Sequence, residues 1–232
     1  TVQLIDEKAN NYTLILNDIS DKYLIEGLKM ADEQKDRVIA TISHELRTPI
    51  NGILGLLEMA TSRTSDQACL NFLQHCKSCS KLLLYLVNSI LDLSQIRHNS
   101  LKVHKTRFRL TKVLAEIASL YLFTAQQKNI ELIIENQLED PLLVVETDEL
   151  KLIEILINLI GNAFKFTFSG HVKLHVRLDP EHHSKILFEI EDTGIGIKAQ
   201  DKPKLFQMFG KLNHQDQNIN THGVGLGLTI SN

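Results

Sequence analysis

The apolar positions in the first part of the chain recur at the three- and four-residue spacing of an amphipathic helix. One such stripe consists of Val38, Ile42, Leu46, Ile50, Ile53 and Leu57. At about 100° per residue these side chains share one face, so the pattern predicts a long helix over residues 18–60. The spacing is looser at the start of the chain, and we interpret residues 1–34 as a helical connector from an input domain or, alternatively, as a frayed helix end.

A second helix is predicted over residues 67–97, where leucine, isoleucine and valine form a wide apolar face. The stretch 61–66 between the two helices is polar and rich in capping residues, which favours a short turn. Two helices joined in this way form a hairpin, and one hairpin cannot bury both apolar faces. The pattern therefore predicts a homodimer, in which two hairpins form a four-helix bundle over residues 35–100.

From residue 101 the pattern changes to a mixture of short strands and amphipathic helices. Strands are predicted at 101–108, 130–135 and 142–146, and helices at 111–127 and 147–164. Two later stretches, 172–178 and 186–190, alternate apolar and polar residues, which is typical of a strand hairpin with one buried face. Residues 101–232 are therefore predicted to form an α+β domain that follows the helical hairpin.

Composition excludes several classes of function. The chain has 232 residues, a length that favours two modules. Its residues are 43% hydrophobic and 23% charged and its net charge is -3, a composition that is ordinary for a soluble globular protein. It has no basic cluster and no apolar run long enough to cross a bilayer, so we expect no nucleic-acid partner and no membrane contact within this segment. Three cysteines do not make a disulfide framework and fit a reducing compartment.

A run of reactive side chains lies within the first predicted helix: Ser43, His44, Glu45, Leu46, Arg47, Thr48, Pro49 and Ile50. His44 lies about 160° from Leu46 around the helix, so its imidazole faces away from the apolar stripe. A neutral imidazole is a nucleophile near pH 7, and the adjacent Glu45 is placed to accept or orient its proton. Taken alone, a histidine beside a glutamate more often belongs to a solvated helix face.

Polar residues form a stripe on the otherwise apolar helix predicted at 147–164. Asn158, Asn162 and Lys165 follow one another at i, i+4 and i+7, so they share one side of the helix. Amide oxygens and a lysine on one stripe suit a metal ion and phosphate groups. The plainer alternative is that the asparagines cap a neighbouring loop.

Glycines follow an acidic residue at the end of a predicted strand. Asp192 is placed to accept a hydrogen bond from an exocyclic amine, and Gly194 and Gly196 allow close backbone approach. Alone, this motif is also typical of a simple turn. Three more glycines precede a predicted helix, whose N-terminal amides favour phosphate: Gly223, Gly225 and Gly227.

In this order, these motifs resemble the H, N, G1, F and G2 boxes of the sensor histidine kinases of two-component systems. The matching stretches are 43–50, 158–167, 192–197, 205–209 and 223–228. The resemblance implies a dimerisation and phosphotransfer domain (HisKA) at 35–100 and a two-layer ATP-binding sandwich of the Bergerat (GHKL, HATPase_c) type at 101–232. Because the sequence ends soon after the last box, we expect this sandwich to be truncated at its C-terminus.

The resemblance also implies roles for individual residues. His44 would be phosphorylated with ATP, Glu45 would assist, and Thr48 would orient a water in receiver dephosphorylation. The expected partners are a second copy of the chain and a response-regulator receiver domain, whose aspartate would take the phosphoryl group. Asn162 would bind Mg²⁺, and the residues expected to bind ATP are Asn158, Asn162, Lys165, Asp192, Gly194, Gly196, Lys211, Gly223, Gly225 and Gly227.

Other interpretations remain open beside the kinase. Val224 stands where the family often has a small hydroxyl residue, and Glu154 stands where it often has glutamine. With the expected truncation, Val224 motivates the alternative of a noncatalytic dimeric signalling scaffold. Cys76 and Cys79 have a spacing known from metal sites, but they lie in an apolar helix without a second pair, which favours packing. We expect a cytoplasmic segment and leave open whether its parent is a hybrid or a membrane-anchored kinase.

Overall fold

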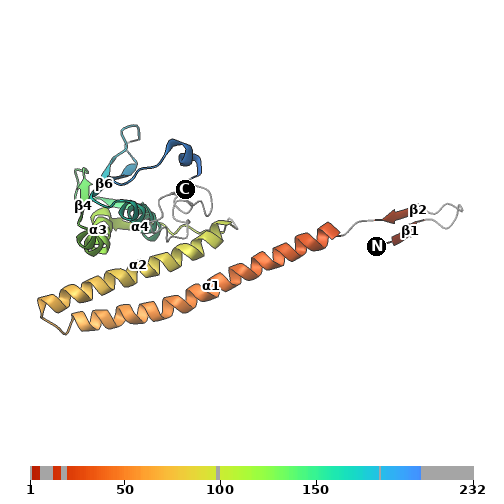
Figure 1. Ribbon diagram of the computed structural model, residues 1–232, viewed down its shortest axis with the longest axis horizontal. Coiled ribbons are helices and arrows are strands. Elements are labelled where there is room, and N and C mark those ends of the chain that lie inside the picture. The colour runs from red at the N-terminus through yellow and green to blue at the C-terminus, as the bar shows by residue number, and fades with distance from the viewer. Residues whose placement is uncertain (1, 6–12, 17–19, 98–99, 183, 205–232) are drawn as a thin grey trace. The chain divides into compact units, whose positions relative to one another are not determined.

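The computed structural model describes residues 2–5, 13–16, 20–97, 100–182 and 184–204 (Figure 1). The chain forms two compact units, residues 1–42 and 43–232. In the first unit the strands β1 (Val2–Ile5) and β2 (Thr13–Leu16) pair antiparallel, and helix α1 (Ser20–Thr61) begins after them. The helical connector predicted over residues 1–34 is therefore wrong for these two segments.

The physical reason for this correction lies in the length of the apolar runs. Leu14 and Ile15 belong to the broken helical spacing on which the prediction depended. In the structure they lie in β2, where Leu14 pairs with Leu4 and Ile15 with Gln3. A run of four residues is too short for its periodicity to distinguish a helix from a strand. Pairing with a second short run then decides for strands, because each strand supplies the hydrogen-bond partners of the other.

Helices α1 and α2 (Gln67–Arg97) form the predicted hairpin. Arg47 donates to Asn88 Oδ1 at 3.0 Å, and Lys77 Nζ lies 3.0 Å from Glu58 Oε1, so the two helices run antiparallel (Figure 1). At the turn, Asp66 Oδ1 accepts a hydrogen bond from the backbone N–H of Cys69 at 2.8 Å and caps α2. The hairpin and both ends of its second helix are confirmed.

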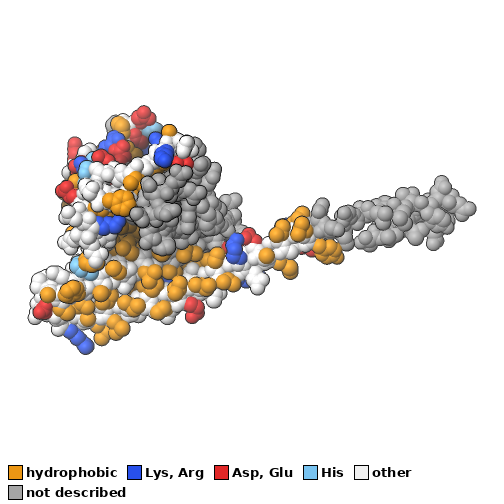
Figure 2. Space-filling model, in the orientation of Figure 1, with side chains coloured by type: hydrophobic (Ala, Val, Ile, Leu, Met, Phe, Trp, Pro, Cys, Tyr) orange, Lys and Arg blue, Asp and Glu red, His pale blue; other side chains and the backbone are white. Residues whose placement is uncertain are grey.

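Most large apolar side chains of the hairpin stay on its surface in one copy of the chain. Ile50 and Val87 are buried where the two helices meet. Figure 2 shows hydrophobic side chains gathered along both helices. In the second unit, the exposed ones include Leu46, Ile53, Leu56, Met59, Phe72, Leu83 and Leu86.

The module after the hairpin contains a mixed sheet and two long helices, as predicted. Its strands are β3 (Thr106–Arg109), β4 (Ile130–Asn136), β5 (Val144–Thr147), β6 (Gly170–Leu178) and β7 (Ile186–Asp192). Its helices are α3 (Leu110–Lys128), α4 (Glu149–Phe166) and the short 3-10 helix η1 (Ala199–Lys204). A helical hairpin followed by an α/β sandwich is therefore confirmed. No helix in the described part of the chain has the length and apolarity needed to span a membrane.

The core of the module lies between its three-stranded sheet and the helices α3 and α4 (Figure 1). The strand order is β4-β6-β7, with β4 parallel and β7 antiparallel to β6. On β6, Val172, Leu174 and Val176 are fully buried, while the residues between them face the other side. The alternation predicted for this hairpin is confirmed, and it leaves the second face of the sheet polar.

Packing between α3 and α4 fixes the position of the second helix. The ring of Tyr121 stacks on Phe164 with centroids 5.3 Å apart, and its hydroxyl donates to the backbone oxygen of Ile157 at 2.7 Å. Burial raises the pKa of Tyr121 far above its usual range, so the hydroxyl remains a donor. This helix carries the predicted polar stripe, which is therefore rigidly positioned.

Candidate functional site

His44 lies on an exposed side of α1, as the stripe geometry predicts. Its side chain is 74% exposed, that of Glu45 is 78% exposed, and His44 Nδ1 lies 4.0 Å from Glu45 Oε1. Because the two ring nitrogens point in different directions, an Nδ1 that faces the carboxylate leaves Nε2 for an incoming group. The pair is open to solvent and can be reached by a large substrate.

Neighbouring residues anchor the helix around His44. Ser43 and Ile50 are buried, and Arg47 holds Asn88 of α2. Thr48 Oγ1 donates to the backbone oxygen of His44 at 3.3 Å, which places its hydroxyl one turn from the imidazole. The imidazole is thus exposed, and the backbone that carries it is held against the second helix by the contact of Arg47 with Asn88.

The polar stripe of α4 lies opposite the residues that this helix buries. Ile153, Leu156 and Ile160 face the core, whereas Asn158, Asn162 and Lys165 lie about 140° to 200° from Ile160 around the helix. The Nδ2 atom of Asn158 is buried, and no residue in the described part of the chain accepts a hydrogen bond from it. A buried donor without a partner is costly, so this stripe is suited to a polar ligand.

The turn after β7 approaches the end of α4. The backbone N–H of Ile195 donates to the backbone oxygen of Phe166 at 3.2 Å, and Lys165 Nζ lies 5.2 Å from the centre of the Phe166 ring. Residues of the predicted N and G1 boxes are thereby brought to one end of the sandwich. They come from segments that are about thirty residues apart in the sequence.

Glycine is required at position 194 because the backbone passes close to its neighbours. A Cβ atom there would lie 2.5 Å from Phe166 O and 2.8 Å from Asp192 Oδ1. The N–H of Gly194 donates to Asp192 Oδ1 at 2.9 Å, which orients the carboxylate. Gly196 has a φ of 65°, a conformation that favours glycine.

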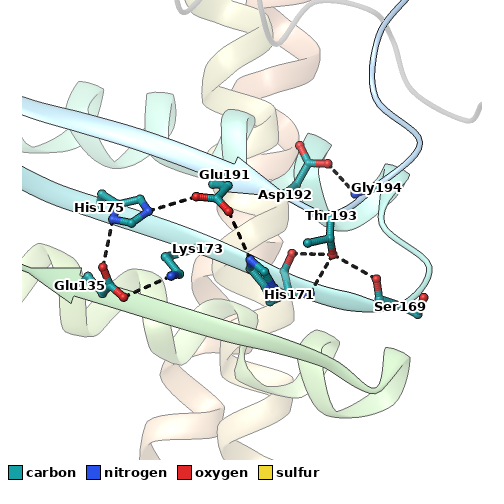
Figure 3. A network of polar contacts seen from close by, with 9 residues as sticks. All are labelled: Glu135, Ser169, His171, Lys173, His175, Glu191, Asp192, Thr193 and Gly194. Carbon is teal, nitrogen blue, oxygen red and sulfur yellow. Dashed lines mark hydrogen bonds and ion pairs between the residues drawn. The ribbon is translucent and has the colours of Figure 1, made fainter.

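Thr193 anchors this turn to the sheet, a role that sequence reasoning missed. Its Oγ1 accepts a hydrogen bond from His171 N at 2.9 Å and donates to Ser169 O at 3.1 Å (Figure 3). Gly170 has a φ of 101°, and a Cβ there would lie 2.2 Å from Thr193 Oγ1. The only signal in the sequence is the threonine between Asp192 and Gly194, which also fits an ordinary turn.

A ladder of charged side chains covers the polar face of the sheet next to this turn (Figure 3). His175 lies between Glu135, at 3.0 Å from Nδ1, and Glu191, at 3.4 Å from Nε2. His171 also contacts Glu191 at 3.4 Å, and the hydrogen bonds from His171 and His175 lower the pKa of the Glu191 carboxyl. The ladder joins the three strands and holds β7 just before Asp192.

Two protein-family models match the chain. Residues 34–99 match the His Kinase A (phospho-acceptor) domain, and residues 147–232 match the histidine kinase-, DNA gyrase B-, and HSP90-like ATPase domain. The chain belongs to the sensor histidine kinases. In this histidine kinase, the exposed His44 lies within the phospho-acceptor match, and Asn158, Asn162 and Asp192 lie within the ATPase match.

Curated relatives agree with the family models. The autoinducer 2 sensor kinase/phosphatase LuxQ of Vibrio harveyi is 36% identical over 211 residues, covering 88% of this chain and 24% of LuxQ. Hybrid signal transduction histidine kinase B of Dictyostelium discoideum is 34% identical, covering 90% of this chain and 11% of that protein. The sensor histidine kinase RcsC of Escherichia coli is 32% identical, with 89% and 21% covered. The chain thus spans about a quarter or less of these relatives.

A solved structure shares the arrangement of the histidine kinase. Full-length ShkA, crystallised in complex with AMPPNP, matches with a TM-score of 0.54 and 28% sequence identity, over 84% of this chain and 39% of ShkA. The family match assigns residues 147–232 of the module to this family of ATPase domains. Four of the predicted ATP-binding residues lie outside the described residues: Lys211, Gly223, Gly225 and Gly227.

The described residues fit a nucleotide with a metal ion. Asn158 offers a buried donor that has no partner among the described residues. The side-chain oxygen of Asn162 is the type of ligand that Mg²⁺ prefers, and Lys165 supplies a positive charge for phosphate. In the described part of the chain, no cluster of histidine, cysteine and carboxylate residues could hold a metal ion.

Proposed function

We propose that this chain is a protein-histidine kinase core that phosphorylates His44 with ATP and passes the phosphoryl group to the aspartate of a receiver domain. The observation that supports this proposal most directly is the exposed pair of His44 and Glu45 on an anchored helix. An ATP-binding module on the same chain supplies the donor. A nucleophile and a nucleotide site are the two components that this transfer requires.

The proposed transfer uses the two nitrogens of the imidazole differently. The lone pair of His44 Nε2 forms a bond to the γ-phosphorus, and the bond from phosphorus to the ADP oxygen breaks. The positive charge on the imidazole is offset by Glu45, which faces Nδ1 at 4.0 Å and accepts or orients its proton. The products are phosphohistidine and ADP, and no other side chain is phosphorylated on the way.

On the module, we assign Asp192 to the adenine and the polar stripe of α4 to the phosphates. The Asp192 carboxylate is oriented by Gly194 N–H and is placed to accept a hydrogen bond from an exocyclic amine. Asn162 would hold Mg²⁺, which neutralises phosphate charge, and Lys165 and Asn158 would contact the same groups. Lys211, Gly223, Gly225 and Gly227 stay predicted ATP-binding residues.

A second copy of the chain is the proposed partner of the hairpin. Exposed residues of α2 follow a heptad pattern at 69, 72, 76, 79, 83 and 86. The three free cysteines lie in this stripe beside Phe72, Leu83 and Leu86. Pairing of two such stripes would complete a four-helix bundle over residues 35–100, with the catalytic domain at 101–232.

A receiver domain would take the phosphoryl group from the phosphohistidine. The phosphorylated receiver is also the proposed substrate of a phosphatase activity of this chain. LuxQ is named a kinase and phosphatase, and the relative from Dictyostelium discoideum is named a hybrid kinase. Thr48 lies one turn after His44 and is exposed. Its hydroxyl donates to the backbone oxygen of His44, so its oxygen would orient a hydrolytic water by accepting a hydrogen bond from it. We assign this segment to the cytoplasm, where ATP and receivers occur.

Labelling with γ-labelled ATP and Mg²⁺ tests the proposed function. We expect acid-labile label on the chain and its loss to background in His44→Gln, because the acceptor nitrogen is removed. His182→Gln is the matched control, since His182 is an exposed histidine in a turn and should keep full labelling. Nucleotide binding without label on the unaltered chain would instead support the scaffold.

A further inference from the structure

A buried ionic cluster joins the hairpin to the ATP-binding module. Lys151 of α4 contacts Asp92 of α2 and lies 2.9 Å from Glu154 Oε2, one turn further along its own helix. The carboxylate side chains are 9% exposed for Asp92 and 2% for Glu154, whereas Lys151 is partly exposed. Two largely buried acidic groups thus flank a single, partly exposed ammonium.

Other contacts follow the same seam between α2 and the module. Ser78 Oγ donates to the backbone oxygen of Ser119 at 3.1 Å, and Lys81 Nζ lies 2.6 Å from Glu116 Oε1. Tyr85 packs in the core of the module, and its hydroxyl donates to the same Glu116 oxygen at 3.2 Å. The cluster at Asp92 is therefore one end of a continuous interface.

The segment that connects the two parts is fixed at the same end. Asp148 Oδ1 caps α4 by accepting from Lys151 N at 3.1 Å, and Asp148 Oδ2 accepts from the backbone N–H of His104 at 2.8 Å. This contact explains why residues 101–105 do not extend β3, which begins at Thr106. The first turn of α4 thus holds both the connecting segment and α2.

The charges of the cluster do not balance when both carboxylates are ionised. One ammonium then faces two negative charges in a buried place, which is costly. Burial, and then hydrogen bonding with Asp92, raises the pKa of Glu154 to about 7, against the opposite effect of Lys151. Burial tends to lower the pKa of Lys151, but its hydrogen bonds to Asp92 and Glu154 raise it, so the ammonium stays charged.

We propose that Asp92, Lys151 and Glu154 form a proton-dependent clasp that holds the ATP-binding module against α2. When Glu154 is protonated, it hydrogen-bonds Asp92, and Lys151 neutralises the one remaining charge. When Glu154 ionises, two carboxylates repel each other and the clasp weakens. This inference concerns the docking of the module and does not depend on the proposed catalysis.

Burial places the pKa of Glu154 close to neutral pH. On α2 it is faced by Asp92 and Tyr85, and burial raises the pKa of Tyr85 far above its usual range, so the phenol stays neutral. On α3, Glu116 is paired with Lys81, and on α4, Glu149 is paired with Lys112. A cavity of about 500 Å³ lies beside the cluster and gives protons a route to it; its lining includes Asp92, Lys151, Lys102, His104 and Asp148.

The sign of the pH effect follows from the direction of the pKa. Because docking raises the pKa of Glu154 above the 4.5 of the free side chain, protonation favours the docked state. Docking is tightest in acid and weakens as the pH rises through about 7. Between pH 6 and pH 8, the docking equilibrium should change by about tenfold.

Hydrogen exchange on the full chain without nucleotide tests the clasp. Peptides from α2 and from residues 100–105 are compared at pH 6 and pH 8, after correction for intrinsic exchange rates. In the unaltered chain, we expect the protection of these peptides to be about tenfold lower at pH 8 than at pH 6. Glu154→Gln should stay protected at both values, because an amide donates to Asp92 and accepts from Lys151 but does not titrate. Lys151→Met should lose protection at both.

The matched control is Glu131→Gln, on the exposed side of β4 and far from the seam, which should keep the original pH profile. Equal protection of the unaltered chain at the two pH values would overturn the clasp. A Glu154→Gln variant that follows the original profile, or that is unprotected at both values, would overturn it as well. Labelling of His44 can fail or succeed independently of these results.

Discussion

The hairpin and the ATP-binding module use the same apolar residue types in opposite ways. In the module, Leu174 is 0% exposed, and it lies in a core built from α3, α4 and the sheet. In the hairpin, Leu86 is 51% exposed. Among the described residues, the module therefore closes its core within one chain, whereas the hairpin leaves an exposed apolar stripe.

The polar residues of the two regions differ in the same way. His44 projects from the hairpin into solvent, and the carboxylate of Glu45 lies beside its imidazole. On the module, Asn158 has a buried amide nitrogen that finds no partner among the described residues. In the proposed function, the hairpin supplies the nucleophile, and the polar stripe of the module binds the phosphates of the ATP that donates the phosphoryl group. This division explains why a kinase of this type needs both.

The largest effect should come from breaking the closed core. Leu174→Ala removes a fully buried side chain and leaves a cavity, so we expect a loss of about 2–5 kcal/mol in the free energy of unfolding of the module. Chemical denaturation, followed by circular dichroism, measures this loss. Association of the hairpins should be unchanged. A dimer that dissociates in this variant would show that the two regions are not independent.

The same substitution in the hairpin should have the opposite outcome. Leu86→Ala leaves the module folded, but each copy loses about 1.5 kcal/mol of apolar burial in the dimer. Two copies together raise the dimer dissociation constant by about 100-fold. Sedimentation equilibrium measures the constant, with the exposed Leu142→Ala on the module as control. An unchanged constant would remove the α2 stripe from the proposed interface.

Periodicity predicted the elements of the molecule wherever one face is buried and the other is not. Val172, Leu174 and Val176 alternate with polar residues, so β6 could be assigned together with the direction of its side chains. The second helix of the hairpin could be bounded because residues 61–66 contain capping groups, and Asp66 does cap α2. Local chemistry was sufficient for these features.

Features that depend on distant contacts could not be predicted in this way. The pairing of β1 with β2, the seam of Lys151 with Asp92, and the role of Thr193 each join residues that no helical or strand period relates. For the candidate site, helical periodicity predicted which side of its helix carries His44 and which carries Asn158 and Asn162, and the resemblance of the motifs supplied their expected roles. The hydrogen bond from Ile195 N to Phe166 O, which brings two of the site's segments together, could be found only from the structure.

A smaller effect is expected from changing the close approach at the nucleotide turn. In Gly194→Ala, the new Cβ would lie 2.5 Å from Phe166 O, so the turn and the Asp192 carboxylate must move. We expect ATP affinity to fall by about tenfold or more, equivalent to about 1.4 kcal/mol. Calorimetric titration with an ATP analogue measures it. The control is Gly55→Ala on α1, where nothing lies within 4 Å and the helix should gain slightly in stability.

The smallest effect concerns the unpartnered amide on α4, and it separates stability from binding. Asn158→Leu removes a buried nitrogen that lacks a partner among the described residues, so the nucleotide-free module should gain about 1 kcal/mol in free energy of unfolding. ATP affinity should fall, because the ligand loses a hydrogen bond. Asn136→Leu is the matched control: its Oδ1 accepts from Leu138 N at 3.2 Å, so this change should lower stability and leave affinity unchanged. If Asn158→Leu destabilised the nucleotide-free module, Asn158 would have a structural role. The main observation that supports ligand binding by the polar stripe of α4 would then be lost.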